Sequence, residues 1–309
     1  MSKTGLSLLL ISTLALAVLA CSGKGDDYIP APSPPIEEPW DDTPTIVFDG
    51  ARTVTVCPGV EWTAFHGTWE GQIRNINIVR TTLNEHNSLG IYYNYTQEGL
   101  KNLDEKCYFL NAVAGTNGPM ACCQFVRVDG SVKRAAREAE DWICNCALTI
   151  DDGVVDIVKV KDNYAAAKLT NKNVGCAGPL LVWEGIVQKC PEEWLASDTD
   201  KWLTTTHPRT AIGLSKDGKT VVQVAVDGRW TSSDTNKRAI GMSTELLGKL
   251  MRGLGCYKAM NFDGGGGTAM FVLGYGDGGI VNHPCDGRDW DHPQQMLRAT
   301  GNAVYIISN

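Results

Sequence analysis

Short segments that favour β-strands alternate with turn-forming residues along most of the chain, and this pattern restricts the fold more than any other feature. Runs rich in Val, Ile and Tyr lie between Gly, Asn and Asp residues. These runs are residues 53–56, 73–79, 89–95, 125–128, 154–160 and 221–226. No internal repeat and no second linker interrupts them. The pattern predicts an α+β fold, a single domain with a mixed or antiparallel β-sheet core and a few helices.

Two segments are expected to be helical. Leu and Met side chains recur along one face of residues 246–254, behind Ser243 as a candidate N-cap. Glu245 falls in the first turn of this helix. A second helix is expected over residues 133–143, where Ala and Glu dominate.

The N-terminus has the features of an export signal. An apolar run from Leu6 to Ala20 follows a charged start and is too short to span a bilayer as a stable anchor. We therefore expect residues 1–20 to be a signal peptide. Small residues followed at once by Cys21 are similar to the lipobox of bacterial lipoproteins, which predicts lipidation of Cys21. The alternative is an ordinary secretory signal with a chance cysteine.

The residues after Cys21 have the composition of a linker. Residues 22–45 are rich in Pro and acidic side chains, which cannot form a core and favour extended chain. We expect residues 21–45 to be a lipid-anchored tether and residues 46–309 to be the globular domain. The acidic stretch 22–27 is similar to the surface-export signals of some lipoproteins. The expected location is therefore membrane-anchored outside the cytoplasm, in the periplasm or on the cell surface.

Charge and cysteine content restrict the partners and the chemistry. The net charge is −7 and the Lys and Arg residues are scattered, so no basic stripe is present for nucleic acid. Ten of the eleven cysteines follow Cys21, an even number that predicts disulfides in an exported protein. The adjacent pair Cys122 and Cys123, and the close pair Cys144 and Cys146, should each bridge elsewhere. No zinc-binding spacing is found, which disfavours a metal as the reason for these cysteines.

A glycine run is the most informative local feature. Asn261, Phe262 and Asp263 precede four glycines, Gly264, Gly265, Gly266 and Gly267, and Thr268 follows them. Apolar segments, residues 256–260 and 269–273, lie on either side. Glycines let ligands approach the backbone and let successive N–H groups point toward an anion. The run therefore predicts an anion site, with a flexible hairpin loop as the alternative.

Four more charged residues are candidates for chemistry. Arg209, in His-Pro-Arg-Thr, could hold a phosphate, or could be a surface Arg at the start of a strand. Asp227 and Arg229 flank Gly228 at the end of the run 221–226, where strand ends often carry sites but Asp-Gly is also a common turn. Glu245 could be catalytic or could only complement the helix dipole.

Taken together, these segments resemble one family, the phosphodiester glycosidases related to the lysosomal uncovering enzyme, N-acetylglucosamine-1-phosphodiester alpha-N-acetylglucosaminidase. The resemblance is carried by four motifs in the same order: HPRTAIG, VDGR, the GMSTELL helix and AMNFDGGGG followed by Thr268. Upstream, Asn111 lies where the family has an Asn-Ala segment, and Gly178-Pro179-Leu180 is similar to its Gly-Pro-x-Leu segment. One departure is Gly267, which stands where the family usually has a hydroxyl residue.

The resemblance implies a site that cuts the bond between an anomeric carbon and a phosphate, releasing a sugar, with N-acetylglucosamine as one candidate. It implies that Asp263, Glu245 and Asp227 are the catalytic carboxylates. Arg209, Arg229, the backbone of Gly264–Gly267, and Thr268 are expected around the phosphate, with Asn111 and Asn261 as hydrogen-bond partners of the substrate. No cofactor is expected, although a Ca2+ or Mg2+ near Asp263 would be compatible with its carboxylate.

Two other readings remain open from the sequence. A lipid-anchored module that binds carbohydrate without catalysis would also explain the tether and the nine tryptophans. It would not need three carboxylates beside two arginines. The same fold could alternatively serve polysaccharide assembly or cell-wall trimming.

Overall fold

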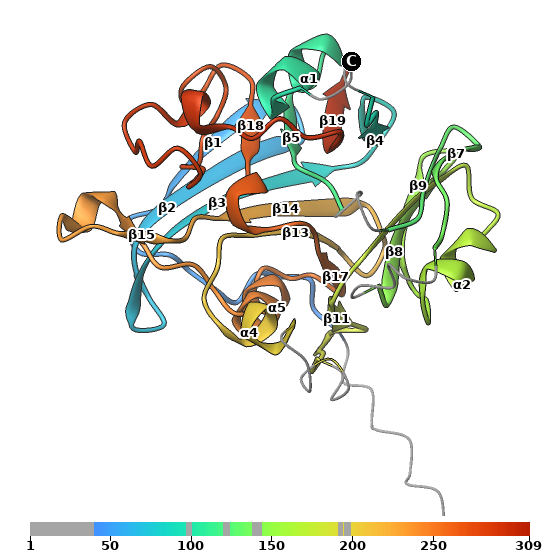
Figure 1. Ribbon diagram of the computed structural model, residues 1–309, viewed down its shortest axis with the longest axis horizontal. Helices are drawn as coiled ribbons and strands as arrows, with labels where there is room; N and C mark the ends of the chain where they lie inside the picture. The colour runs from blue at the N-terminus through green and yellow to red at the C-terminus, as the bar shows by residue number, and fades with distance from the viewer. Residues whose placement is uncertain (1–39, 97–100, 120–123, 138–143, 191–193, 195–198) are drawn as a thin grey trace, which may run out of the picture. The chain divides into compact units, whose positions relative to one another are not determined.

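The computed structural model describes residues 40–309, except 97–100, 120–123, 138–143, 191–193 and 195–198 (Figure 1). The expected signal peptide, Cys21, most of the expected tether, and the pair Cys122 and Cys123 lie outside the described residues. No described helix is both long enough and apolar enough to cross a membrane.

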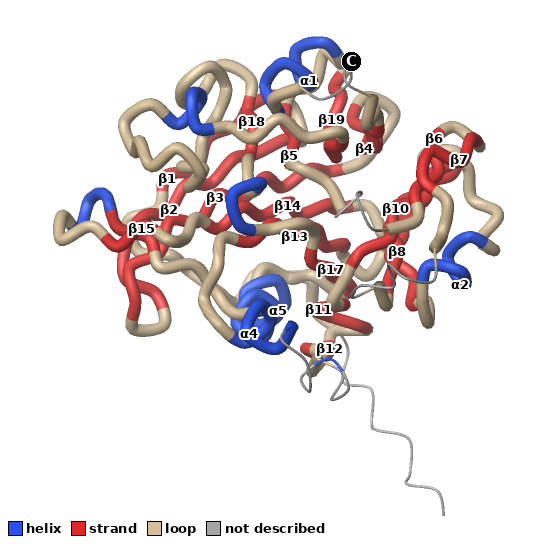
Figure 2. The backbone as a smooth tube through the Cα atoms, viewed as in Figure 1, coloured by secondary structure: helices blue, strands red, loops and turns tan. Residues whose placement is uncertain are grey.

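An eight-stranded sheet forms the centre of the described part (Figure 2). In spatial order its strands are β1 (Arg52–Cys57), β2 (Val60–Trp69), β3 (Gln72–Thr82), β14 (Thr220–Val226), β13 (Arg209–Leu214), β17 (Lys258–Asn261), β11 (Leu180–Trp183) and β12 (Ile186–Val187). All of these neighbours pair antiparallel.

Smaller sheets and short helices surround the central sheet. A four-stranded sheet contains β18 (Met270–Val272), β5 (Ala114–Thr116), β19 (Asn302–Ser308) and β4 (Asn87–Tyr93). A five-stranded sheet contains β7 (Ser131–Arg134), β6 (Val126–Val128), β10 (Asn173–Ala177), β8 (Cys146–Asp151) and β9 (Val154–Lys159). A ribbon pairs β15 (Trp230–Thr231) with β16 (Arg238–Ala239). The α-helices are α1 (Leu103–Phe109), α2 (Asn163–Ala167), α4 (Thr199–Thr204) and α5 (Thr244–Gly253). The 3-10 helices are η2 (Thr235–Lys237), η3 (Gly265–Gly267) and η4 (Pro293–Met296). The predicted α+β class is confirmed.

Both faces of the central sheet are covered, and the strand sequences reflect this. Along β14, Val222 and Val224 point into the core beneath α5, whereas Val221 and Ala225 point into the core shared with the four-stranded sheet. Side chains alternate between the faces of a strand, so a strand buried on both faces needs a continuous apolar run. That run is residues 221–226 of the sequence, broken only by Gln223, which donates from Nε2 to Val304 O and Thr116 Oγ1.

The helix predicted behind Ser243 is confirmed as α5. The Ser243 hydroxyl accepts a hydrogen bond from the N–H of Leu246, which satisfies one of the unpaired donors at the helix start. Leu247, Leu250 and Met251 are fully buried against the central sheet. The apolar face that the sequence showed is therefore the face that packs.

The helix predicted over residues 133–143 is wrong at its start. Lys133 and Arg134 belong to β7, which pairs with β6 in the register Val126 to Arg134. Pairing with a neighbouring strand overrides the helical preference of single residues. Residues 138–143 lie outside the described part.

The segment just before the predicted domain start lies against the sheet and α5. The indole of Trp40 lies 4.1 Å from the guanidinium carbon of Arg252. The N–H groups of Thr45 and Ile46 both donate to Gly253 O, at the C-terminal end of α5. Residues 40–45, placed in the tether by composition, thus supply partners that a helix end requires.

The described cysteines lie mainly in the cores. Cys57, Cys107, Cys144, Cys146, Cys256 and Cys285 carry unbridged thiols. The sulfurs of Cys144 and Cys176 lie 2.8 Å apart in the small core that contains Ala166 of α2. The disulfides expected from an exported chain stay a prediction.

Replacing Ser243 with Ala should lower the free energy of unfolding by about 1 kcal/mol, because the Leu246 N–H loses its acceptor. Ser243→Asp, which keeps an acceptor at the N-cap, is the matched control and should unfold like the wild type. Urea denaturation of the three proteins measures the difference. Equal stability of the Ala variant would mean that the cap contributes nothing.

Candidate functional site

Three neighbouring strands place the predicted motifs at one edge of the central sheet. In the antiparallel registers, Arg209 at the start of β13 faces Val226 at the end of β14, and Ala211 faces Asn261 at the end of β17. The segments that follow β14 and β17 therefore leave the sheet beside each other. These are the Asp-Gly-Arg segment and the glycine run.

The glycine run crosses from one sheet to another and is not a hairpin loop. β17 pairs with β13 and β11, whereas β18 pairs with β5 in the four-stranded sheet. Its backbone is held in place, since Asp263 N–H donates to Gly118 O and Gly265 N–H donates to Pro208 O. The alternative of a flexible hairpin is thereby excluded.

Close packing explains why glycines occupy this run. Gly265 has φ +64°, a conformation that L-residues rarely adopt. A Cβ at Gly266 would overlap the carboxylate of Asp286. A second layer of polar groups thus lies directly on the backbone of the run.

Asp263 is the carboxylate at the start of the run. Burial raises its pKa to about 6, against the opposing effects of the Gly264 N–H and the positive charge of Arg298. Asn117 fixes the backbone here, because its Nδ2 donates to Asp263 O at 2.8 Å and its Oδ1 accepts from Thr210 Oγ1 at 2.7 Å. A carboxyl group that titrates near pH 6 can serve as a base, a nucleophile or an acid at neutral pH.

Arg229 lies over the run. Its guanidinium Nη2 is 3.2 Å from the position that a Cβ of Gly265 would occupy, and 3.3 Å from His207 Nδ1. The residue is exposed and has φ +65°, an unusual backbone conformation for a side chain of this size. A Cβ added to the preceding Gly228 would lie only 2.6 Å from Pro208 N, so the turn has no room for a side chain at this position.

Arg209 is in a different environment. Its guanidinium is fully buried, and its Nε donates to Met242 O at 2.9 Å while Nη2 donates to Trp202 O and Thr205 O. Burial, together with the charge of Arg229, lowers its pKa to about 9. These bonds join β13 to α4 and to the segment before α5, whereas Nη1 is buried and has no hydrogen-bond partner among the described residues. The expected role of Arg209 at a phosphate stays a prediction.

Asp227 is a buried hydrogen-bond centre. Its Oδ2 accepts from Asn75 Nδ2 at 2.6 Å and from His283 N–H at 2.7 Å, and its Oδ1 accepts from Asn282 Nδ2 at 2.8 Å. Asn282 also donates to Thr268 O at 3.1 Å. Both oxygens accept from donors that hold the site together, and the expected catalytic role of Asp227 stays a prediction.

An ion pair between Arg298 and Asp286 also lies against the glycine run, at Gly266. Arg298 donates from Nε and Nη2 to Asp286 Oδ2, both at 2.7 Å. The same Arg298 is one of the charges that act on Asp263. No group of three or more His, Cys, Asp or Glu side chains among the described residues is arranged to hold a metal ion.

Comparison with known families agrees with this arrangement. The sequence model of the phosphodiester glycosidase family matches residues 109–307. The chain belongs to this family. A search of curated proteins found no significant match.

Solved structures with a similar fold include a family relative. The catalytic domain of zebrafish N-acetylglucosamine-1-phosphodiester alpha-N-acetylglucosaminidase, auto-inhibited by its pro-peptide, matches with a TM-score of 0.62 at 16% identity. The match covers 84% of this chain and 88% of that domain. A hypothetical protein from Synechocystis matches with a TM-score of 0.57 at 11% identity, over 84% of this chain and 64% of that one. At these identities the likeness establishes the fold.

Two residues that the family resemblance had placed in the site are exposed on the surface, away from the glycine run. Asn111 is exposed just after α1, with φ +53°. Its N–H donates to Tyr108 O, and Asn117 is the asparagine that reaches the run. Glu245 is exposed on α5 and forms an ion pair with Lys249 at 2.9 Å, so it is not brought to Asp263.

The other expected residues have supporting positions in the phosphodiester glycosidase fold. Asn261 is buried, and its Nδ2 donates to Gly178 O at 3.1 Å and to Phe262 O at 2.6 Å. The Thr268 hydroxyl is buried at the end of the run and has no hydrogen-bond partner among the described residues. It is therefore available to a ligand that reaches the end of the run.

Several residues of the candidate site were missed from the sequence. These are Asn75, Asn117, His207, Asn282, His283, Asp286 and Arg298. One signal was present, since Asp286-Gly287-Arg288 repeats the Asp-Gly-Arg triplet of residues 227–229. The asparagines gave no such signal, because a buried amide cannot be told from a surface amide in one sequence.

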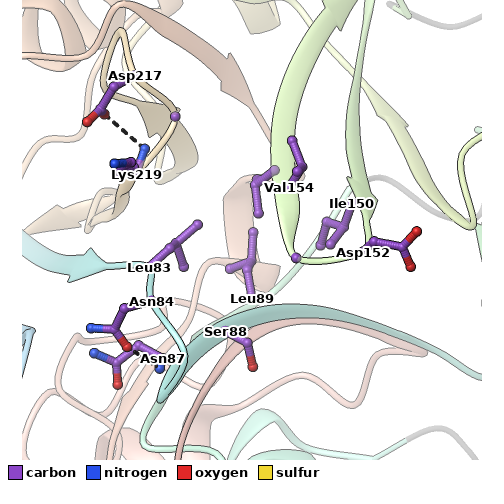
Figure 3. Close-up of a pocket in the computed structure, with 13 residues that line it drawn as sticks. Leu83, Asn84, Asn87, Ser88, Leu89, Ile150, Asp152, Val154, Asp217 and Lys219 are labelled. Atoms are coloured by element: carbon purple, nitrogen blue, oxygen red, sulfur yellow. Dashed lines mark hydrogen bonds between the residues drawn. The ribbon is translucent and has the colours of Figure 1, made fainter.

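A separate cavity lies at the opposite edge of the central sheet (Figure 3). It has a volume of about 390 Å3 and is enclosed by three turns, which contain Asn84, Asp152 and Asp217. Asp217 precedes β14, whereas Asp227 follows the same strand at the other edge. The cavity is therefore separated from the glycine run by the length of β14.

Asp263→Asn should make the protein more stable at neutral pH. The pKa of Asp263 in the folded protein, about 6, lies above its value in the unfolded chain. The contribution of this carboxyl group to the free energy of unfolding is therefore fully present below pH 4 and is lost as the pH rises through 6. The variant should gain about 1–3 kcal/mol at pH 7, and nothing at pH 4.

Denaturation of both proteins at the two pH values measures this gain. Asp217→Asn is a control of opposite sign, because hydrogen bonds from Ser215 and Lys219 lower the pKa of that carboxyl. If Asp263→Asn raised the free energy of unfolding equally at both pH values, the raised pKa of Asp263 would be contradicted.

Proposed function

We propose that the protein hydrolyses sugar 1-phosphodiesters, breaking the bond between the anomeric carbon and the phosphate oxygen. The observation that carries the proposal is the position of Asp263. This carboxyl group has a pKa of about 6 and lies at the start of the glycine run, and the exposed Arg229 lies over that run. Glycosidases act on the anomeric carbon with carboxyl groups, and phosphates are bound by guanidinium and backbone N–H groups. The site combines both requirements.

The phosphate is assigned to Arg229 and to backbone N–H groups of the run. Gly265 N–H is already used by Pro208 O, so neighbouring glycines supply the amides. The Thr268 hydroxyl, buried without a partner among the described residues, completes the set. Donors fixed in advance stabilise the negative charge that develops on the leaving phosphate.

Asp263 is assigned to the sugar side of the bond. Cleavage of the diester at the anomeric carbon releases a phosphate monoester as a stable anion, so the reaction needs less help from a general acid than cleavage of an ordinary glycoside does. Asp263, ionised above pH 6, then attacks the anomeric carbon or removes a proton from the attacking water. The water oxygen finishes on the anomeric carbon, and the electron pair of the broken bond leaves with the phosphate.

The identity of the sugar is proposed from the relative. The zebrafish enzyme of similar fold is named for an N-acetylglucosamine-1-phosphodiester. N-acetylglucosamine-1-phospho-mannose is therefore the first substrate to test. Phosphodiesters of other sugars form the comparison panel.

The purified body, residues 40–309, should release N-acetylglucosamine from this substrate, and Asp263→Asn should lose at least about 100-fold in kcat/KM. Running the reaction in isotopically labelled water should place the label in the sugar, because the carbon–oxygen bond breaks. Label in the phosphate would indicate a phosphodiesterase instead. Binding of the sugar without any release, across the panel, would favour a carbohydrate-binding module.

The rate should rise with pH through about 6 and then level off, since ionised Asp263 is the reactive form. Measuring kcat/KM between pH 4 and 8 tests this. A rate that falls through the same range would assign Asp263 as the general acid. Glu245→Gln is the matched carboxyl control, and it should keep the wild-type profile because Glu245 is exposed on α5.

A further inference from the structure

A chain of three hydrogen bonds ends on Arg229. The Thr205 hydroxyl donates to Lys201 O. Its oxygen lies 2.9 Å from His207 Nε2, and His207 Nδ1 lies 3.3 Å from Arg229 Nη2. The chain joins the C-terminal part of α4 to the guanidinium above the glycine run.

The hydrogen atoms in this chain can be assigned. A guanidinium has only donors, so His207 Nδ1 must accept from Arg229. The Thr205 hydrogen is already given to Lys201 O, so the Thr205 oxygen must accept from His207 Nε2. The ring is therefore the neutral tautomer with its proton on Nε2.

The electrostatic surroundings keep this ring neutral. Burial lowers the pKa of His207, and the positive charges of Arg209 and Arg229 lower it further, while the Lys201 carbonyl opposes them. A protonated ring would lose the lone pair that Arg229 requires. The charge distribution and the hydrogen-bond pattern thus favour the same state.

The backbone of His207 is also fixed. Its N–H donates to Met242 O at 3.1 Å, and its C=O accepts from Met242 N–H at 3.0 Å. The next residue, Pro208, packs against Gly228, and both Pro208 and Arg209 are buried. The imidazole therefore presents Nδ1 from a rigid position, whereas Arg229 itself is exposed.

We propose that His207 is a positioning residue that holds the Arg229 guanidinium over Gly265, where the phosphate of the substrate binds. The proposal rests on the proposed function, since it gives Arg229 its phosphate. A long exposed side chain loses much rotamer freedom when it binds a ligand, and ordering it beforehand removes that cost. His207 is assigned no contact with the substrate.

The test compares two replacements of the same ring. In His207→Asn the amide oxygen takes the place of Nδ1 and can accept from Arg229, whereas His207→Phe keeps a ring without any acceptor. Loss of a hydrogen bond to a charged group should weaken binding of inorganic phosphate, and raise KM, by roughly 5- to 30-fold in the Phe variant. The kcat should change less than about 3-fold, and the Asn variant should stay within about 3-fold of the wild type in both parameters.

A purely structural role would give another result. Equal losses in the Asn and Phe variants, or full phosphate affinity in the Phe variant, would overturn the proposal. Thermal unfolding of both variants shows whether they fold. If the Phe variant does not fold, His207→Gln replaces it, because its amide lies too far out to occupy the Nδ1 position.

Nitrogen NMR of the histidine rings tests the tautomer without any turnover. A proton on His207 Nε2 at neutral pH, and a change in the Nδ1 resonance in Arg229→Gln, are expected. A proton on Nδ1, or a doubly protonated ring, would overturn the proposal. If the tautomer and the phosphate results hold but no sugar phosphodiester is hydrolysed, the proposed function fails and the positioning role remains.

Discussion

The buried carboxylate of Asp227 is the constraint on which the site depends. A charged group in this position is stable only when donors surround it, and those donors come from β3, at Asn75, and from the segment after β18, at Asn282 and His283. Because Asn282 also binds the backbone at Thr268, the end of the glycine run is fixed to the same centre. One carboxylate thereby joins the central sheet, the segment after β18 and the end of the glycine run.

The sequence analysis assigned Arg209 and Arg229 together to a phosphate, but the two arginines lie in different environments. Arg209 is buried, with Nε and Nη2 on backbone carbonyls and Nη1 without a partner among the described residues. Arg229 is exposed on a strained turn and is directed over the run. Burial is the main cause of the lowered pKa of Arg209, and the nearby positive charge of Arg229 lowers it further. The site therefore concentrates positive charge where an anion can relieve it.

The sequence was sufficient for some of these features and not for others. The apolar run of β14 and the leucine pattern of α5 report local periodicity, so their structure could be predicted. Arg209 and Arg229 could not be distinguished, because each follows a Pro or Gly beside a strand and only the register of β13 decides which is buried. Asn117 was missed in favour of Asn111. Asn111 follows the end of α1 and is exposed, whereas Asn117 directly follows β5 and is buried.

Trp40 and Thr45 lie against the end of the central sheet opposite the glycine run. These residues bind at the C-terminal end of α5, and Asp42 accepts from the N–H of Lys216, which follows β13. The glycine run lies at the start of β13, at the other end of the strand. Trp40 and Asp42 therefore lie at the end of β13 remote from the glycine run. A substitution at Trp40 can act on that run only through the length of this strand.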